Sequence, residues 1–187
     1  MTELIEFETD RLKLRQWKPG DRDPFAALNA DPQVMEFFPA PLDRAASDAM
    51  VDRCQSGITE RGWGFWAAEI KETSQFIGFV GLHIPGYDLP FSPCVEIGWR
   101  LAVPFWGKGL ATEAARGALQ VGFDRIGLAQ IVSFTTINNI RSQAVMKRIG
   151  MQETDTIFQH PLVPVDSNLG KHCLYVLSRD QWELVSG

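Results

Sequence analysis

The sequence predicts an α+β fold, in which helices are combined with a mixed, α/β-like β-sheet. Segments with the two-residue alternation of strands are interspersed with segments of helical period along the whole chain. Two apolar segments, 64–70 and 76–83, are separated by a short polar stretch, which is typical of a hairpin. A further strand-like segment, 95–103, runs through a glycine turn directly into a helical pattern. Together these three observations favour one sheet with helices packed against it.

Composition limits the function classes. A chain of 187 residues, 45% apolar and 22% charged, is typical of one soluble globular domain, which we expect to span residues 1–187. A net charge of −5 without a basic block disfavours a nucleic-acid partner. No apolar run approaches the roughly 20 residues that cross a bilayer, so no membrane partner is expected.

Cysteine usage and the N-terminus favour a cytoplasmic protein. The first 15 residues are charged and lack the apolar core of a secretion signal. Cys54, Cys94 and Cys173 are widely spaced, and no CxxC pair predicts zinc, so we expect buried reduced thiols and no metal.

The N-terminal elements follow from alternation, helical period and capping residues. Thr9–Trp17 alternates like a strand and ends before a Pro-Gly turn. Either Asp21 or Asp23 can cap a helix that continues to Leu28. A short helix is expected at 33–38, broken by two prolines, and a longer one at 43–61, closed by Gly62.

Later segments alternate between strands and helices. Residues 84–93 contain three prolines and predict a loop before the strand at 95–103. A β-branched run predicts a strand at 130–136, and apolar spacing predicts a helix at 142–149 that ends at Gly150. The remaining strands are expected at 157–164 and 171–177.

The turn after the strand at 95–103 is a candidate phosphate site. Gly107 and Gly109 bracket Lys108, and the helical pattern begins near Ala111. A glycine turn that leads into a helix collects free N–H groups at the positive end of the helix dipole. The spacing fits neither a P-loop, which needs GxxxxGK[ST], nor a dinucleotide fingerprint, which needs Gly or Ala where Thr112 stands. Glycines in an ordinary strand–helix turn remain the alternative.

The run Trp106-Gly107-Lys108-Gly109-Leu110-Ala111 resembles the pyrophosphate loop of the GNAT acetyltransferase superfamily, whose pattern is [Gln/Arg]-x-x-Gly-x-[Gly/Ala]. Trp106 replaces the usual Gln or Arg, as in the subgroup that contains the ribosomal-protein-alanine N-acetyltransferases. Further segments look like this subgroup in the same order, namely TDRLKLRQW, FIGFVGL, VEIGW, NIRSQAVMKRIGM and HPLVPVDSNLGKHCLYVLSRDQW. The resemblance covers about residues 8–183 and is weak for the substrate.

The resemblance implies a strongly twisted mixed sheet of about six to seven strands, with helices on both faces. It also implies a V-shaped splay between two parallel strands, here 95–103 and 130–136, that holds acetyl-CoA as cosubstrate. Backbone groups of Leu101 and Val103 would pair with the pantetheine, and Asn139 would hydrogen-bond the same arm. The pyrophosphate would be bound by the loop residues Trp106, Gly107, Lys108, Gly109, Leu110, Ala111 and Thr112.

Two residues are candidates for catalysis. Glu96 lies on the polar face of the strand at 95–103 and could accept the amine proton, although an ion pair with Arg100 is an alternative. Many GNAT members carry a tyrosine general acid seven residues after the Asn, but here that position is Met146. Ser142 is then the candidate proton donor, with a helix cap as its alternative. Glu113, in the first helical turn, is expected to be structural.

Two functions from different classes remain open. The first is an acetyl-CoA-dependent N-acetyltransferase that moves an acetyl group directly, in a ternary complex, to a primary amine. The acceptor is a protein N-terminal α-amine or a small-molecule amine. The second is a non-catalytic module that binds CoA or acyl-CoA. A homodimer is compatible with the subgroup.

Overall fold

The computed structural model describes residues 3–186 and divides the chain into two compact units. Unit 1 contains Met1–His83 and Gly98–Ala118, and unit 2 contains Ile84–Ile97 and Leu119–Gly187. The expected single domain over 1–187 stays a prediction, and each unit is described by itself.

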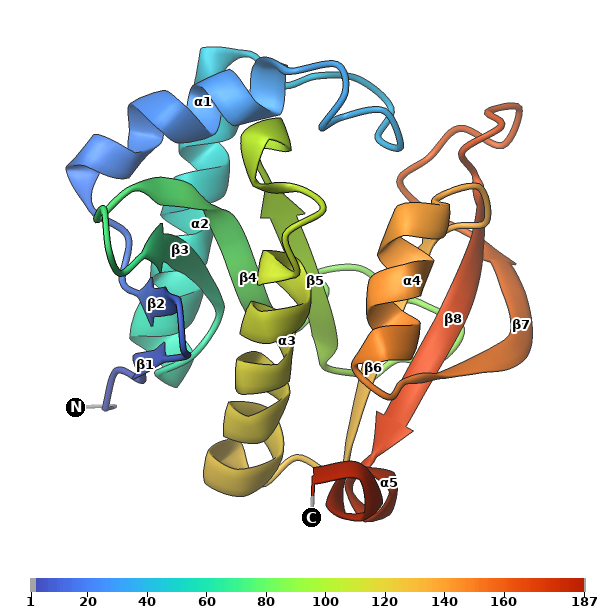
Figure 1. Cartoon of the computed structure of the whole chain (residues 1–187). Helices are drawn as coiled ribbons and strands as arrows, with labels where there is room; N and C mark the ends of the chain where they lie inside the picture. Colours follow the sequence, from blue (N-terminus) through green and yellow to red (C-terminus); the bar gives the residue numbers. More distant parts are fainter. Residues whose placement is uncertain (1–2, 187) are drawn as a thin grey trace. The chain divides into compact units, whose positions relative to one another are not determined.

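Unit 1 is built on antiparallel strands that lie side by side in the order β1-β2-β3-β4, followed by the second half of β5 (Figure 1). Pairing of Leu14 with Ala68 and of Trp66 with Val80 sets the register. The expected hairpin is therefore confirmed. The strand bounds are β1 Phe7–Glu8, β2 Leu12–Arg15, β3 Phe65–Ile70, β4 Phe76–His83 and β5 Glu96–Leu101.

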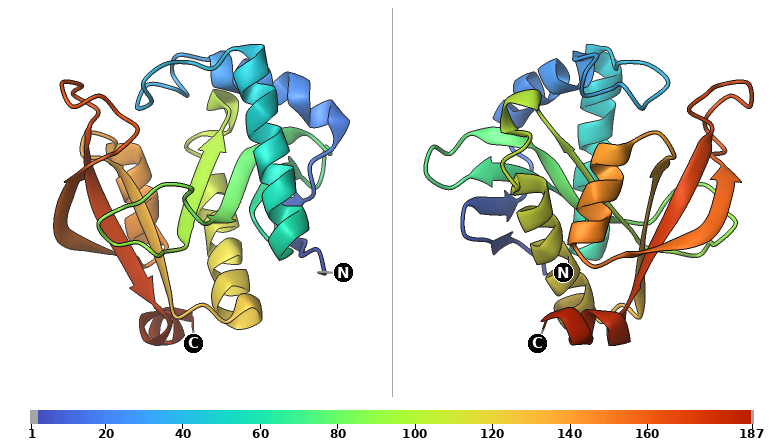
Figure 2. Two further views of the ribbon diagram at one scale, coloured as in Figure 1. Left: turned by 180° about the vertical axis from the view of Figure 1, so that it is seen from behind. Right: turned by 45° about the vertical axis from the view of Figure 1, so that its right-hand side comes forward.

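Helices cover both faces of the unit 1 strands. Helix α1 (Arg22–Ala30) packs against α2 (Arg44–Arg61), and α2 packs on β3. Helix α3 (Leu110–Gln120) lies in front of the strands in Figure 1, whereas α2 comes to the front when unit 1 is seen from behind in Figure 2. The sequence signals at the ends of α2 are confirmed, because Asp43 accepts a hydrogen bond from the Ala46 N–H at 2.8 Å and Gly62 has φ +85°.

Two glycines of β4 allow backbones to approach closely. A Cβ atom on Gly78 would collide with the Arg100 carbonyl oxygen, and one on Gly81 would collide with the Gly64 carbonyl oxygen. Both obstacles are backbone atoms, which cannot rotate away as a side chain can. The spacing between β4 and its neighbours therefore depends on the missing side chains at these two positions.

Two expectations for unit 1 are wrong in detail. Residues 33–38 form turns instead of a helix, because the Asp31 side chain accepts from the Gln33 N–H at 2.8 Å and the prolines at 39 and 41 leave no room for further turns. The strand expected at 95–103 ends at Leu101, and Val103–Phe105 forms a 3-10 turn.

In unit 2, the first two residues of β5 lie beside β6 (Gln130–Thr136), which is followed in the sheet by β8 (Lys171–Ser178) and β7 (Gln152–Gln159). Strands β5 and β6 are parallel, with Glu96 opposite Val132, and the β6–β8 and β8–β7 pairs are antiparallel. Both directions occur, so the predicted mixed sheet is confirmed. The structure describes eight strands, against about six to seven expected.

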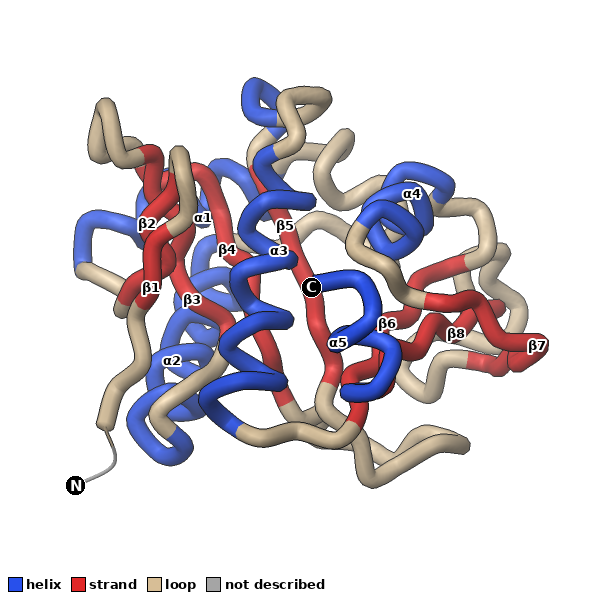
Figure 3. Tube along the Cα trace, turned by 60° about the horizontal axis from the view of Figure 1, so that its bottom comes forward, coloured by secondary structure: helices blue, strands red, loops and turns tan. Residues whose placement is uncertain are grey.

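The helices of unit 2 follow its strands. Helix α4 (Ile140–Arg148) packs against β6 and β7, and α5 (Arg179–Ser186) continues directly from β8 (Figure 3). A π-helical segment, Val121–Ile126, follows α3. Arg179 donates to the Phe123 carbonyl within this segment at 2.6 Å and to the Leu128 carbonyl just after it at 3.0 Å.

Strand β7 corrects the expected strand at 157–164. Near its end, Ile157 pairs with Cys173 and the last residue, Gln159, pairs with Lys171. The strand ends before the prolines at 161 and 164, which lack the N–H that a ladder needs. Upstream the register shifts between Glu153 and Ile157. This irregularity and the polar sequence hide the strand from a search for alternating apolar residues.

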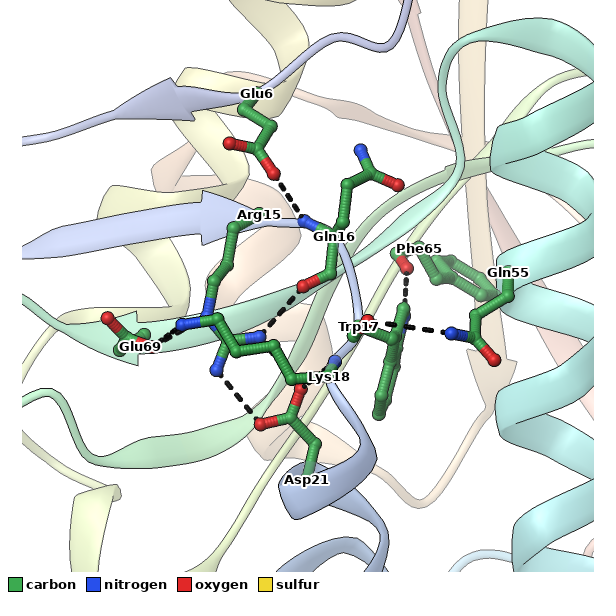
Figure 4. Close-up of polar contacts among 9 residues, drawn as sticks. All are labelled: Glu6, Arg15, Gln16, Trp17, Lys18, Asp21, Gln55, Phe65 and Glu69. Atoms are coloured by element: carbon green, nitrogen blue, oxygen red, sulfur yellow. Dashed lines mark hydrogen bonds and ion pairs between the residues drawn. The ribbon is translucent and has the colours of Figure 1, made fainter.

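A buried ion cluster supports the start of unit 1 (Figure 4). The Arg15 guanidinium donates to Asp21 Oδ2 at 2.7 Å and to Glu69 Oε2 at 2.6 Å, and its side chain is only 4% exposed. Burial alone would raise the pKa of Glu69, but the hydrogen bonds and charges of Arg15 and Lys18 together outweigh burial and lower that pKa. This contribution to stability is present above the unfolded pKa of Glu69 and is lost as the pH falls through the folded pKa.

Replacement of Asp21 by Ala is expected to lower the free energy of unfolding by about 3 kcal/mol, because it leaves part of a buried cation unpaired. Urea denaturation measures this loss. Asp23→Ala is the matched control, since the Asp23 side chain is 83% exposed in a surface pair with Arg44, and it should cost less than about 1 kcal/mol. Equal losses in both variants would contradict a structural role for the buried cluster.

Candidate functional site

The glycine loop of unit 1 has the geometry of an anion site. Gly107 and Gly109 have φ +71° and +76°, in the left-handed region that favours glycine. Helix α3 begins at Leu110, and the Glu113 N–H makes the first return bond, to the Gly109 carbonyl at 3.0 Å. The N–H groups of Leu110, Ala111 and Thr112 therefore precede the helical ladder at the positive end of the helix dipole.

Glu113 ties this loop to the N-terminal strands. Its Oε1 accepts from the Thr9 hydroxyl at 2.6 Å and from the Arg11 N–H at 2.8 Å, while its Oε2 accepts from Arg11 Nε at 2.6 Å. Arg11 in turn donates from Nη1 to the Lys108 carbonyl at 2.9 Å. Burial alone would raise the pKa of Glu113, but these hydrogen bonds outweigh burial and lower it. These contacts agree with the structural role expected for Glu113.

Trp106 anchors the loop to the end of β5. Its indole N–H donates to the Leu101 carbonyl at 2.7 Å. The carbonyls of Ala102 and Val103 accept from the N–H groups of Phe105 and Trp106, both at 3.0 Å. Among the hydrogen bonds described for residues 3–186, none uses the Val103 N–H, which opens the 3-10 turn. This N–H is therefore available to a ligand.

Asn139 and Ser142 lie at the start of α4 in unit 2. Asn139 is the N-cap, because its Oδ1 accepts from the Ser142 N–H at 3.2 Å, and its Nδ2 donates to the Thr135 hydroxyl at 3.0 Å. The cap is thus assigned to Asn139, whereas Ser142 is a half-buried residue in the first turn. An amide carries further hydrogen-bonding capacity, so capping does not exhaust Asn139.

Glu96 begins β5 in unit 2 and is half-buried. Burial raises the pKa of the Tyr87 hydroxyl, and the Glu96 carboxylate raises it further. Burial and then Glu96 have the same effect on the pKa of Cys94. Both neighbours therefore remain neutral beside the carboxylate. The alternative partner, Arg100, directs its guanidinium to the Asn29 amide oxygen at 2.7 Å within unit 1.

A histidine–tyrosine cluster in unit 2 has no signal in the sequence, because its members lie far apart along the chain. Tyr87 Oη is 3.1 Å from His160 Nε2, and the rings of His160 and His172 have centroids 4.7 Å apart. The Leu162 N–H donates to His160 Nδ1 at 3.2 Å, so that nitrogen is unprotonated and Nε2 carries the proton toward Tyr87. Burial and then His172 lower the pKa of His160 to about 4.

The structure therefore distributes the predicted residues over both units. Unit 1 contains Leu101, Val103 and the loop 106–112, and unit 2 contains Glu96, Asn139 and Ser142. Within residues 3–186, no group of three or more His, Cys, Asp or Glu side chains is arranged to hold a metal ion. In the same described range, no helix is both long enough and apolar enough to span a bilayer.

Comparison with known proteins gives a consistent result. Residues 11–152 match the family model described as an acetyltransferase (GNAT) domain. YkkB of Bacillus subtilis, an uncharacterized protein, is 33% identical over 158 residues, covering 84% of this chain and 91% of the relative. The FsC-acetyl coenzyme A-N(2)-transacetylase of Aspergillus fumigatus is 28% identical, covering 93% and 76%.

A solved structure shows the same fold. The GNAT-family acetyltransferase of Bacillus anthracis superposes with a TM-score of 0.79 at 21% identity, covering 94% of this chain and 99% of that one. At this identity the likeness concerns the fold alone.

The pKa of His160 predicts a pH dependence of stability. Between about pH 6.5 and 4, His160 is protonated in the unfolded protein but stays neutral in the folded protein. The free energy of unfolding therefore falls as the pH drops through this range. His160→Asn removes this titration. From pH 7 to 5 the wild type should lose roughly 2 kcal/mol relative to that variant in urea denaturation. Tyr87→Phe keeps the imidazole and should keep the slope; equal slopes for wild type and His160→Asn would contradict the prediction.

Proposed function

Because the chain belongs to the GNAT acetyltransferase family, we propose that it is an acetyl-CoA-dependent N-acetyltransferase that transfers an acetyl group directly to a primary amine. The observation that carries this proposal is the loop 106–112, where two glycines at positive φ lead into the N-terminus of α3. N–H groups in this arrangement suit a pyrophosphate, which is doubly charged and accepts hydrogen bonds.

The residues of the loop fit the group that they would hold. Gly107 has no neighbour within 4 Å of the place where a Cβ atom would stand, and Gly109 has only Arg11, at 3.6 Å. Lys108 and the end of Arg11 add positive charge, and the side chain of Arg11 is 51% exposed. The open space and the charge both support a phosphate-bearing cosubstrate. Asn139 would hold the pantetheine arm through its spare amide capacity.

The proposed transfer balances as follows. The amine nitrogen attacks the thioester carbon, the carbon–sulfur bond breaks, and the amine proton passes to Glu96, which later releases it to solvent. The thiolate receives a proton through the Ser142 hydroxyl, which takes one from solvent in turn. The Val103 N–H would donate to the thioester oxygen as negative charge develops on it. Glu96 is supported as the base by its half-buried place at the start of β5 and by its carboxylate, which can accept a proton.

An amine acceptor is supported by the name of the Aspergillus relative, which is an N(2)-transacetylase. Within this class, both a protein N-terminal α-amine and a small-molecule amine satisfy the same chemistry. A direct transfer needs no acyl-enzyme, and burial raises the pKa of the Cys54 thiol to about 12, which leaves it protonated and a poor nucleophile.

Gly109→Asp tests the loop. The variant places a side chain and a negative charge where the pyrophosphate is proposed to bind, so acetyl-CoA affinity in calorimetry should fall by at least about 100-fold. Gly127→Asp is the matched control for backbone strain, because Gly127 also has positive φ, +83°, and open space around it. The control should bind acetyl-CoA like the wild type. Undiminished binding by a folded Gly109→Asp variant would place the pyrophosphate elsewhere.

Glu96→Gln and Ser142→Ala test the proton transfers. Each should lower kcat by about 100-fold while the KM for acetyl-CoA changes less than about threefold, because the lost group acts on the reacting atoms. Thiol release across a panel of amines and peptides measures both constants. Normal kcat in both variants would return these residues to structural roles, and acetyl-CoA binding without acceptor-dependent thiol release would favour a non-catalytic module.

A further inference from the structure

Arg100, on β5 in unit 1, is a largely buried cation that is surrounded by neutral groups. Its Nη1 donates to Asn29 Oδ1 at 2.7 Å and lies 3.6 Å from Met50 Sδ. Its guanidinium carbon lies 4.3 Å from the centroid of the Phe38 ring and 5.5 Å from that of Phe79. Among the ion pairs described for residues 3–186, none includes Arg100, and its Nε is buried without a hydrogen-bond partner.

The same unit shows how a buried arginine is normally compensated. Arg15 is paired with both Asp21 and Glu69, as Figure 4 shows, and although burial lowers its pKa, the two carboxylates raise it overall. Arg100 behaves in the opposite way. Burial lowers the pKa of Arg100 to about 10, and the described side chains do not reverse the shift. The described side chains therefore do not neutralise the charge of Arg100, and a structural role does not explain that charge.

The side chains around Arg100 hold it in place without neutralising it. Asn29 is fully buried and donates from Nδ2 to the Ser47 hydroxyl at 2.9 Å, which fixes its oxygen toward the guanidinium. Cys54, the side chain whose charge would act on the pKa of Arg100, is kept as the neutral thiol by burial, which raises its own pKa to about 12. These side chains thus hold a planar cation whose counter-ion is not among them.

Arg100 is not fully enclosed by the protein. Arg100 keeps partial exposure, and Phe38, whose ring covers it, is itself 39% exposed. Phe38 belongs to the turns that follow α1, so it is held by a short irregular segment and not by a helix. A ligand that approaches the guanidinium from this side meets one exposed aromatic ring in a short irregular segment.

We propose that Arg100 binds a carboxylate of the acceptor, so that the preferred acceptor is a small amine that also carries a carboxylate group. A carboxylate matches the forked donors of a guanidinium and supplies the missing charge. Nη1 is already held by Asn29, which leaves Nε and Nη2 as the donors for the two oxygens. The identity of the ligand as an acceptor rests on the proposed function, whereas the carboxylate site itself does not.

The first test observes the wild-type protein by NMR and needs no catalysis. The Nε–H signal of Arg100, identified by its loss in Arg100→Lys, should shift on titration with sodium propionate. The Nε–H signal of Arg15, which is bonded to Glu69 at 2.6 Å, should stay in place. An unmoved Arg100 signal, or the same shift with sodium chloride at equal ionic strength, would overturn the carboxylate site.

The second test compares acceptors. Glycine, γ-aminobutyrate and 6-aminohexanoate are each assayed against the matching carboxamide, with acetyl-CoA, so that the length between amine and carboxylate varies. At least one acid should exceed its amide in kcat/KM by about tenfold or more, and Arg100→Gln should reduce that ratio to within about twofold. Arg44→Gln, at an exposed arginine of α2, should keep the ratio.

The two proposals fail in different ways. A wild type with no preference for any acid, or an Arg100→Gln variant that keeps the preference, overturns the role of Arg100. Absence of acetyl-CoA binding and of all acetylation overturns the proposed function, while the propionate titration still decides whether Arg100 is a carboxylate site. If Arg100→Gln does not fold, the titration and the wild-type acid-to-amide ratio decide the question.

Discussion

The carboxylate of Glu113 is the contact on which the loop before α3 depends. It binds Thr9 and both the backbone and the side chain of Arg11, and Arg11 extends the contact to the Lys108 carbonyl. A loop with two left-handed glycines is otherwise free to adopt many conformations, and ordering it costs entropy. By fixing the loop to the turn between β1 and β2, this contact holds the N–H groups at the start of α3 in place without a ligand. The positive end of the helix dipole also stabilises a carboxylate at this position.

Arg15 and Arg100 of unit 1 have different surroundings. Arg15 joins β2, β3 and the turn before α1 through two carboxylates, so its charge is used within the fold. Arg100 makes neutral contacts only among the described residues, which hold its orientation but leave donors unused. A charge such as that of Arg100 adds little to the stability of the fold, because an apolar residue of similar volume would avoid the free-energy cost of removing the charge from water.

Local signals predicted the elements that are determined locally. The Asp43 cap, the Gly62 end of α2, the hairpin β3–β4 and the glycine turn before α3 depend on residues a few positions apart, and each could be derived from spacing. Strand β7 could not, because its register shift and polar residues remove the alternation. The Tyr87–His160 contact and the Arg15 cluster could not either, because they join segments that the sequence gives no reason to place together. The sequence therefore predicted which residues are candidates for binding and catalysis, but the side chains that contact them depend on tertiary structure.

The two glycines of β4 bear on how variation in this chain is interpreted. Gly78 faces the Arg100 carbonyl oxygen in β5, and Gly81 faces the Gly64 carbonyl oxygen just before β3. A side chain at either position would collide with a backbone atom that cannot move aside. Both lie in the segment FIGFVGL. A saturation mutagenesis library selected for function should therefore reject substitutions there as strongly as at a reactive group, although neither glycine contributes a reactive atom. Intolerance to substitution in this segment reflects the close spacing of the backbones, and it does not identify catalytic or binding residues.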